Sequence, residues 1–94
     1  MGRPVTFEGW THQWAHELAL RIDNDQELLR RMRELVGEII DRDWSLWVSA
    51  ALTLLAEIDQ RLGIDTGYKT VADLAGWIDL LEHYEAQVLE ERSR

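Results

Sequence analysis

Three histidines are the first residues whose type and spacing could support chemistry. His12 and His16 are four positions apart, which on a helix places two imidazoles on one face, and Glu17 follows them. A zinc site of the HExxH type needs its second histidine three residues after the glutamate, where this chain has Leu20. A metal would therefore need His83 or a carboxylate from a distant segment as its third ligand. We interpret His12 and His16 as polar surface residues of a helix and predict no metal site.

Other catalytic arrangements are also missing from the sequence. Carboxylate-rich helical bundles can hold two iron ions, but they need a glutamate three residues before each ligand histidine. Those positions are occupied here by Gly9, Gln13 and Leu80. The chain has no cysteine, Ser45 and Ser49 have no histidine near them in sequence, and no phosphate loop or nucleophile elbow is present. We therefore predict a protein that is not an enzyme and uses no cofactor.

The charge balance limits the partners that the chain can bind. There are 18 acidic residues and 10 basic ones, which gives a formal net charge of −8. A field of that sign repels nucleic acid phosphates and acidic membrane surfaces. The start of the chain lacks a signal-peptide pattern, and no apolar run is long enough to span a bilayer. We predict a cytoplasmic protein with no nucleic acid partner and no membrane partner.

Two segments resemble parts of a DNA-binding protein. The sequence TVADLAG, ending at Gly76, is similar to the first helix of a helix-turn-helix, but the helical pattern continues through Trp77 without a turn. The helix that follows is acidic and has no basic residue before Arg92, so DNA phosphates would repel it. The basic cluster at residues 30–33 is interpreted as a helix face that pairs with Glu27 and Glu34. A helix-turn-helix regulator is therefore the least favoured function.

Four helices must position all of these residues, in one domain that spans residues 1–94. The spacing of the apolar residues predicts no strand and four helices, at about 11–22, 26–41, 43–62 and 70–91. The third helix is apolar almost all round between Trp44 and Ile58, so it needs cover on most sides. Short joints make consecutive helices antiparallel neighbours. The predicted fold class is all-α, a compact bundle of four helices with the third helix central.

Polar residues and glycines are predicted to mark the helix boundaries. Thr11, Asn24, Asp43 and Thr70 are placed to cap the first, second, third and fourth helices, because their side chains can accept from unpaired first-turn N–H groups. Gly63 is placed to end the third helix.

A row of small residues also runs along that third helix, and it would let a neighbouring backbone approach closely. The row consists of Ser45, Ser49, Thr53 and Ala56.

Five tryptophans in 94 residues are the strongest indication of a binding surface. Each buries a large area and needs a partner for its ring N–H, so tryptophans dominate a core, an interface or both. One helix that is apolar nearly all round and three amphipathic ones carry more apolar surface than four short helices bury. We predict binding to a partner protein, with a homodimer as a possible arrangement. The residues predicted to bind are Trp10, Trp14, Trp77 and Tyr84.

The segment GWTHQWAHELALRIDND, from Gly9 to Asp25, resembles a group of small phage- and plasmid-encoded proteins of unknown function. Their N-terminal signature runs G-W-T-N-x-x-T-W, four residues, and then W-[IL]-[DN]-N-[DE]. This chain has His12 in place of the asparagine, and His16 and Arg21 in place of two aromatic residues. The resemblance implies an origin in a mobile genetic element and no assigned activity. The residues that match are Gly9, Trp10, Thr11, Ile22, Asp23, Asn24 and Asp25.

The predicted function is that of a phage-type accessory or host-takeover protein, which binds and occludes a host protein without catalysis. The resemblance implies this, because small acidic proteins of mobile elements often act by binding one host protein. The alternative is an acidic nucleic-acid mimic that blocks a DNA-binding host enzyme. The acidic fourth helix and the charge of −8 favour mimicry, whereas the 10 basic residues dilute it.

Overall fold

The computed structural model describes residues 9–42 and 47–94, except for the side chain of Trp47. No residue in these ranges lies in a strand, so the predicted all-α class is confirmed. The described helices are α1 (Gln13–Asp23), α2 (Gln26–Arg42), α3 (Trp47–Leu62), the short 3-10 helix η1 (Val71–Asp73) and α4 (Leu74–Arg92).

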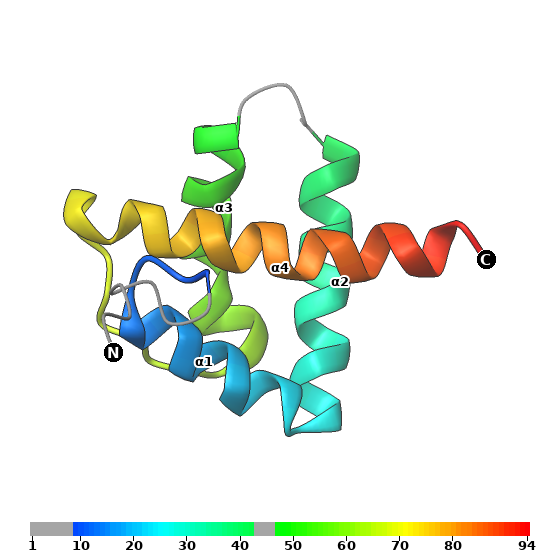
Figure 1. Ribbon diagram of the computed structural model, residues 1–94, viewed down its shortest axis with the longest axis horizontal. Helices are drawn as coiled ribbons and strands as arrows, with labels where there is room; N and C mark the ends of the chain where they lie inside the picture. Colours follow the sequence, from blue (N-terminus) through cyan, green and yellow to red (C-terminus); the bar gives the residue numbers. More distant parts are fainter. Residues whose placement is uncertain (1–8, 43–46) are drawn as a thin grey trace.

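The helices form a bundle in which α4 crosses an antiparallel pair (Figure 1). α2 and α3 run side by side in opposite directions, and each of them also packs against α4. α1 packs against α2 and α4. The core lies where α4 meets the other helices, and four side chains of α4 have no exposed surface. These are Trp77, Leu80, Leu81 and Tyr84.

α3 is covered less completely than the sequence predicted. It packs against both α2 and α4, and its inner side is buried. On its outer side, Val48 and Leu52 remain 49% and 50% exposed. Ser49 and Ala56 in the row of small residues are exposed as well. The helix is apolar all round because its outer face carries small and aliphatic side chains, not because it is enclosed.

Two of the predicted helix caps are wrong. α1 begins after His12, and Thr11 instead donates from its N–H and its hydroxyl to Asp79 Oδ2 on α4, at 2.7 and 2.6 Å. At the start of α2 the capping residue is Asp25 and not Asn24. Asp25 Oδ1 accepts from the N–H groups of residues 27 and 28, at 3.0 and 3.2 Å. Asp25 directly precedes the first helical residue, Gln26, and so has the shorter reach to these groups.

The end of α3 agrees with the prediction, whereas Thr70 precedes the short helix η1 and α4 itself begins later, at Leu74. Gly63 follows the helix with a φ of +72°, a conformation that favours glycine. The Asp73 carboxylate accepts from the N–H and the hydroxyl of Thr70, at 3.1 and 2.8 Å. The predicted cap Asp43, together with Trp44 and Ser45, lies outside the described residues. None of the described helices is long and apolar enough to cross a membrane.

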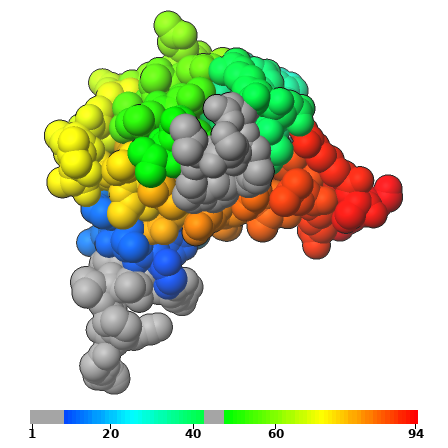
Figure 2. Space-filling view, turned by 90° about the horizontal axis from the view of Figure 1, so that it is seen from above, coloured from blue at the N-terminus to red at the C-terminus, as the bar shows by residue number. Residues whose placement is uncertain are grey.

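Two ends of the molecule differ in how they are packed (Figure 2). The C-terminal part of α4 extends away from the other helices. At the opposite end, the segment before α4 lies against the first residues of α1 (Figures 1 and 2). Trp14 and Tyr68, both partly exposed, lie at this second end.

Candidate protein-binding site

The start of α1, the segment before η1 and the start of α4 meet in a cluster that we call the aromatic end. Its members are Trp14, Tyr68, Val71, Gly76 and Trp77. The Tyr68 ring stacks on the Trp14 ring with 4.6 Å between centroids and 6° between planes. The Trp14 ring in turn contacts the Trp77 ring, at 5.1 Å and 54°. The three rings thus form a ladder that runs from the surface into the core.

Burial increases along this ladder. Tyr68 is 44% exposed, Trp14 is partly buried and Trp77 is fully buried. The Trp77 ring N–H donates to the Tyr68 carbonyl at 2.6 Å, which ties the outer residue to the inner one. Three residues further on, Val71 is 90% exposed. Because the outer rings are held in place before any contact is made, binding here would cost little side-chain entropy.

Gly76 makes room for the ladder. A Cβ atom at this position would lie 2.6 Å from Cζ2 of Trp14, which is closer than side chains tolerate. Trp14 can therefore rest on the backbone of α4 only because residue 76 has no side chain. The sequence predicted that the helical pattern continues past Gly76 without a turn, and α4 does run through this residue without interruption. A glycine inside a helix costs about 1 kcal/mol relative to alanine, and this cost was the available signal for a packing role.

The residues before α1 are fixed to α4 by polar contacts. Thr11 donates to Asp79, as described above, and His12 Nε2 lies 3.0 Å from the carbonyl oxygen of Ala72. The Trp10 ring contacts the rings of His16 and His83, with centroids 5.9 and 5.2 Å apart. Trp10 also lines a small hollow of about 250 Å³ against α4. The described lining consists of Gly9, Trp10, Asp79, Glu82 and His83.

Of the four residues predicted to bind a partner, two remain at the surface. Trp10 and Trp14 are partly buried. Trp77 and Tyr84 have no exposed surface, so the binding role predicted for them is corrected to a role in the core. The sequence placed all four on helix faces or helix entrances, and it gave no means of telling which apolar face would be covered. It also missed Tyr68 and Val71, although an aromatic residue next to the turn at Gly67 was a readable signal.

Tyr84 holds α1 against α4 from within the core. Its hydroxyl donates to Asp23 Oδ1 at 2.8 Å and is 3.3 Å from the carbonyl oxygen of Ala19. Burial, together with the hydrogen bond to the Asp23 carboxylate, raises the pKa of the Tyr84 hydroxyl far above its usual range. The other oxygen of Asp23 lies 3.1 Å from His83 Nε2. Asp23, at the end of α1, is therefore the point to which two side chains of α4 attach.

The three histidines are not brought together. His12 contacts Ala72 in η1, whereas His83 lies beside Asp23 at the other end of α1. Within residues 9–42 and 47–94, no three His, Cys, Asp or Glu side chains are grouped so that they could hold a metal ion. The histidine contacts therefore join helices to one another.

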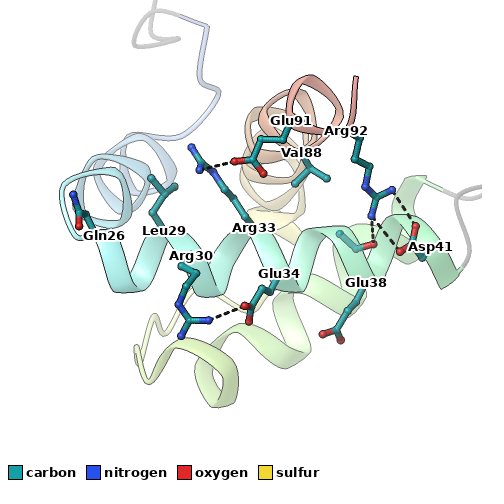
Figure 3. Close-up of a pocket in the computed structure, with 11 residues that line it drawn as sticks. Gln26, Leu29, Arg30, Arg33, Glu34, Glu38, Asp41, Val88, Glu91 and Arg92 are labelled. Carbon is teal, nitrogen blue, oxygen red and sulfur yellow. Dashed lines mark hydrogen bonds and ion pairs between the residues drawn. The ribbon is translucent and has the colours of Figure 1, made fainter. Parts of the chain in front are cut away.

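A groove of about 740 Å³ lies between α2 and α4 (Figure 3). Leu29 and Val88 supply apolar side chains within it, and the remaining lining is mostly charged. Its guanidinium groups are paired inside the groove. The pairs are Arg30 with Glu34 at 2.7 Å, Arg33 with Glu91 at 3.0 Å, and Arg92 with Asp41 at 3.0 Å.

This pairing leaves the groove without an excess of cationic charge for a ligand. The Arg30 and Arg31 side chains also contact Glu27, so the predicted pairing of the basic cluster with neighbouring glutamates is confirmed. These hydrogen bonds lower the pKa of Glu27. The described lining includes no histidine, serine, threonine or lysine. The groove therefore carries less recognition chemistry than the aromatic end, although it is larger.

The outer side of α4 carries exposed carboxylates. Asp79 lines the hollow at Trp10, and Glu82 and Glu90 are exposed further along the helix. No lysine or arginine precedes Arg92 in α4. Burial and the neighbouring Glu82 raise the pKa of Glu85, which shows that like charges lie close together here. A basic partner would find a complementary surface on this helix.

Comparison with known proteins finds no matching family model, no matching curated protein and no matching solved structure. The resemblance of residues 9–25 to phage- and plasmid-encoded proteins therefore stays a prediction. Function has to be argued from the surfaces described above.

Proposed function

We propose that this chain is a small helical domain that binds and occludes a partner protein through its aromatic end, without catalysing a reaction. The observation that carries the proposal is the ordered ladder of Tyr68, Trp14 and Trp77 beside Val71, which is 90% exposed. Tyrosine and tryptophan are enriched among the residues that contribute most to protein interfaces. A rigid aromatic surface next to an exposed aliphatic side chain fits that pattern.

The partner proposed is a host protein, and the chain is proposed to be a phage-type accessory protein. This part rests on the resemblance of residues 9–25. Several of the matching residues have structural duties in this chain, since Thr11 binds Asp79, Asp23 binds Tyr84 and Asp25 caps α2. The resemblance therefore supports the proposal that these proteins attach α1 to the neighbouring helices in the same way. The binding role is supported by the aromatic end itself.

The experiment that tests the binding role is affinity capture from a host lysate with matched surface variants. Val71→Glu adds a charge to the aromatic end at a side chain that has almost no packing to lose. Leu20→Glu, on α1, is the control, because Leu20 is 49% exposed and lies outside the aromatic end. We expect Val71→Glu to abolish capture of one specific band that Leu20→Glu retains. Equal capture by both variants, with unchanged circular dichroism, would contradict the proposal.

A second function, mimicry of nucleic acid, is favoured by the acidic outer side of α4. In a mimic, the carboxylates stand in for phosphates and bind a basic protein, with steep dependence on salt concentration. The test is binding to basic DNA-binding proteins by the double variant Glu82→Gln and Glu90→Gln. Glu34→Gln and Glu38→Gln form the control pair, because these carboxylates already face arginines. Binding that is lost only in the α4 variant supports mimicry, and binding that Val71→Glu abolishes supports the aromatic end.

A further inference from the structure

A second surface, on the outer side of α3, has a different character. The residues that we call the α3 face are Val48, Ser49, Leu52, Thr53 and Ala56. From Val48 to Ala56 the sequence VSAALTLLA contains no charged residue. Surface helices normally carry charged side chains on the side that faces water. The outer sides of α2 and α4 follow that rule, and this part of α3 does not.

The polar groups of the α3 face do not make it hydrophilic. The Thr53 hydroxyl donates to the backbone carbonyl of Ser49 at 3.1 Å, so its hydrogen is used within the helix. Val48 and Leu52, one turn apart, are each about half exposed. The face therefore presents two aliphatic side chains flanked by small ones.

A hollow lies at Ser49 and Thr53, the small residues of the α3 face. It has a volume of about 130 Å³ and lies between α2 and α3. Arg42, at its edge, is held by Glu57 at 3.0 Å and by Glu38 at 3.5 Å. The charge at the rim is thus compensated, and the rest of the described lining is small or apolar. The described lining consists of Ile39, Arg42, Ser49, Ala50 and Thr53.

We propose that a second copy of this chain covers the α3 face, in an antiparallel pairing about a twofold axis near Leu52. A twofold interface must be complementary to itself, with each projection of one copy matched by a recess in the other. The α3 face carries both parts, because Leu52 is half exposed and Ser49 and Thr53 of the same helix line the hollow. In this register, Val48 of one copy faces Ala56 of the other. The small side chains allow the two helices to approach closely.

The charge of the chain limits the surfaces through which two copies can pair. Each copy has a formal charge of −8, so most contacts between copies bring like charges together. Pairing through α4 would place Glu82 and Glu90 against the same residues of the other copy. The stretch from Val48 to Ala56 has no carboxylate, and the carboxylates of Glu38 and Glu57 near the hollow are paired with Arg42. The acidic chain can therefore associate with itself at this face.

The expected dimer is weak. A stretch of nine residues on one helix covers much less than the roughly 1,200–2,000 Å² of a standard interface. Association should thus depend on concentration and leave the aromatic end of each copy free for a partner. The proposal goes beyond the proposed function, and the two use different surfaces.

Engineered cysteines give a direct test, because the chain has no cysteine of its own. Leu52→Cys places a thiol next to the proposed axis, and Leu20→Cys places one on α1 with the same exposure. Under mild oxidation we expect a disulfide-linked dimer from Leu52→Cys at concentrations where Leu20→Cys stays monomeric. Equal linkage in both variants, or linkage only in Leu20→Cys, would overturn the proposal.

Analytical ultracentrifugation supplies a second test without any cross-link. The wild-type chain should show a reversible dimer at high micromolar concentration. Leu52→Glu should weaken this dimer at least tenfold, because it places two carboxylates at the axis, whereas Leu20→Glu should leave it unchanged. Ser49→Leu should also weaken it, by filling the recess. A wild-type chain that remains monomeric at millimolar concentration overturns the proposal, and so does a dimer that Leu52→Glu does not affect.

Discussion

At the aromatic end each exposed ring rests on a more buried one, whereas along the α3 face Val48 and Leu52 project singly from the helix. Tyr68 is connected through Trp14 to Trp77 in the core, and the Trp77 ring N–H returns to the Tyr68 backbone. Leu52 has no such support. A change to a ring of the aromatic end should therefore affect folding as well as binding, and a change on the α3 face should affect association alone.

This difference indicates how each surface can recognise a partner. A supported aromatic surface has a fixed shape, so it can select one partner by complementarity. A row of separate aliphatic side chains selects mainly by the absence of charge and by size. Variants can measure how strongly each surface is coupled to the core. They are described below, from the largest to the smallest expected effect on the free energy of unfolding.

Gly76→Ala should have the largest effect. The added methyl group would lie 2.6 Å from Cζ2 of Trp14, so the ladder must shift. We expect a loss of about 1–3 kcal/mol in the free energy of unfolding, as for other overpacked cores, although alanine favours helix. Urea unfolding followed by tryptophan fluorescence measures this loss.

The matched control for that variant is Gly37→Ala in α2. There the new Cβ would lie 3.4 Å from a flexible arginine nitrogen, Nη2 of Arg92, which can move aside. Gly37→Ala should therefore be neutral or stabilising by up to about 1 kcal/mol. If both alanine variants are equally stable, Trp14 is not seated on the α4 backbone as described.

Tyr84→Phe should have the next largest effect, because it removes a hydrogen bond between α1 and α4. The Asp23 carboxylate loses the hydroxyl at 2.8 Å, and a loss of about 1–2 kcal/mol is expected at neutral pH. Tyr68→Phe is the control, since the exposed Tyr68 ring makes its contact through the face and not through its hydroxyl. Chemical unfolding of both variants should show a change only for Tyr84→Phe.

The raised pKa of Tyr84 predicts that the stability of the folded chain decreases at alkaline pH. Because the pKa of Tyr84 is raised in the folded state, the unfolded chain loses this proton first as pH rises. The stabilisation is complete below the ordinary tyrosine range, near pH 10, and decreases above it. Wild-type stability should therefore fall more steeply above about pH 10 than that of Tyr84→Phe. Parallel pH profiles for the two proteins would contradict the buried position of this hydroxyl.

The helices were predictable from the sequence because their signals are local. The apolar spacing predicted four helices, and Gly63 marked the end of α3 correctly. The role of Thr11 was not predictable, because it depends on a contact with α4 across the bundle. The role of Asp25 was not predictable either, because Asp25 and Asn24 differ by only one residue in their distance from the first turn of α2. Trp77 and Trp14 both lie on apolar stripes, and only the crossing of α4 over its neighbours decides which of them is enclosed.

The binding surfaces were predictable only in part. Their composition was visible, because tryptophans and an uncharged stretch of α3 can be read directly. Their locations were not visible, because exposure depends on which faces the other helices cover. Tyr68 lies in a segment without regular structure, where no periodicity predicts how a side chain points.

Tyr68→Ala and Leu52→Ala compare the two surfaces directly. Removing the Tyr68 ring breaks the stacking on Trp14, so we expect a loss of about 1 kcal/mol in the free energy of unfolding. Removing the outer part of Leu52, which is half exposed, should change stability by less than about 0.5 kcal/mol. Thermal and urea unfolding at low protein concentration, where any dimer dissociates, measure both. Equal losses would mean that the α3 face is as strongly coupled to the core as the aromatic end.

Asp73→Asn should have the smallest effect on the free energy of unfolding. Asp73 is the last residue of η1, so its effect should be local to the segment that carries Val71. The hydroxyl and the N–H of Thr70 both donate to the Asp73 carboxylate, and these bonds lower the pKa of that carboxyl group. A lowered pKa stabilises the folded state above the ordinary carboxyl range, and this contribution disappears as pH falls through the folded-state value. The variant should therefore be slightly less stable than wild type at neutral pH and equal to it in strong acid. Amide hydrogen exchange at residues 70–74 locates the effect, because η1 should open before the helices do. A difference between the two proteins that persists in strong acid would show that the carboxylate does not act through these hydrogen bonds.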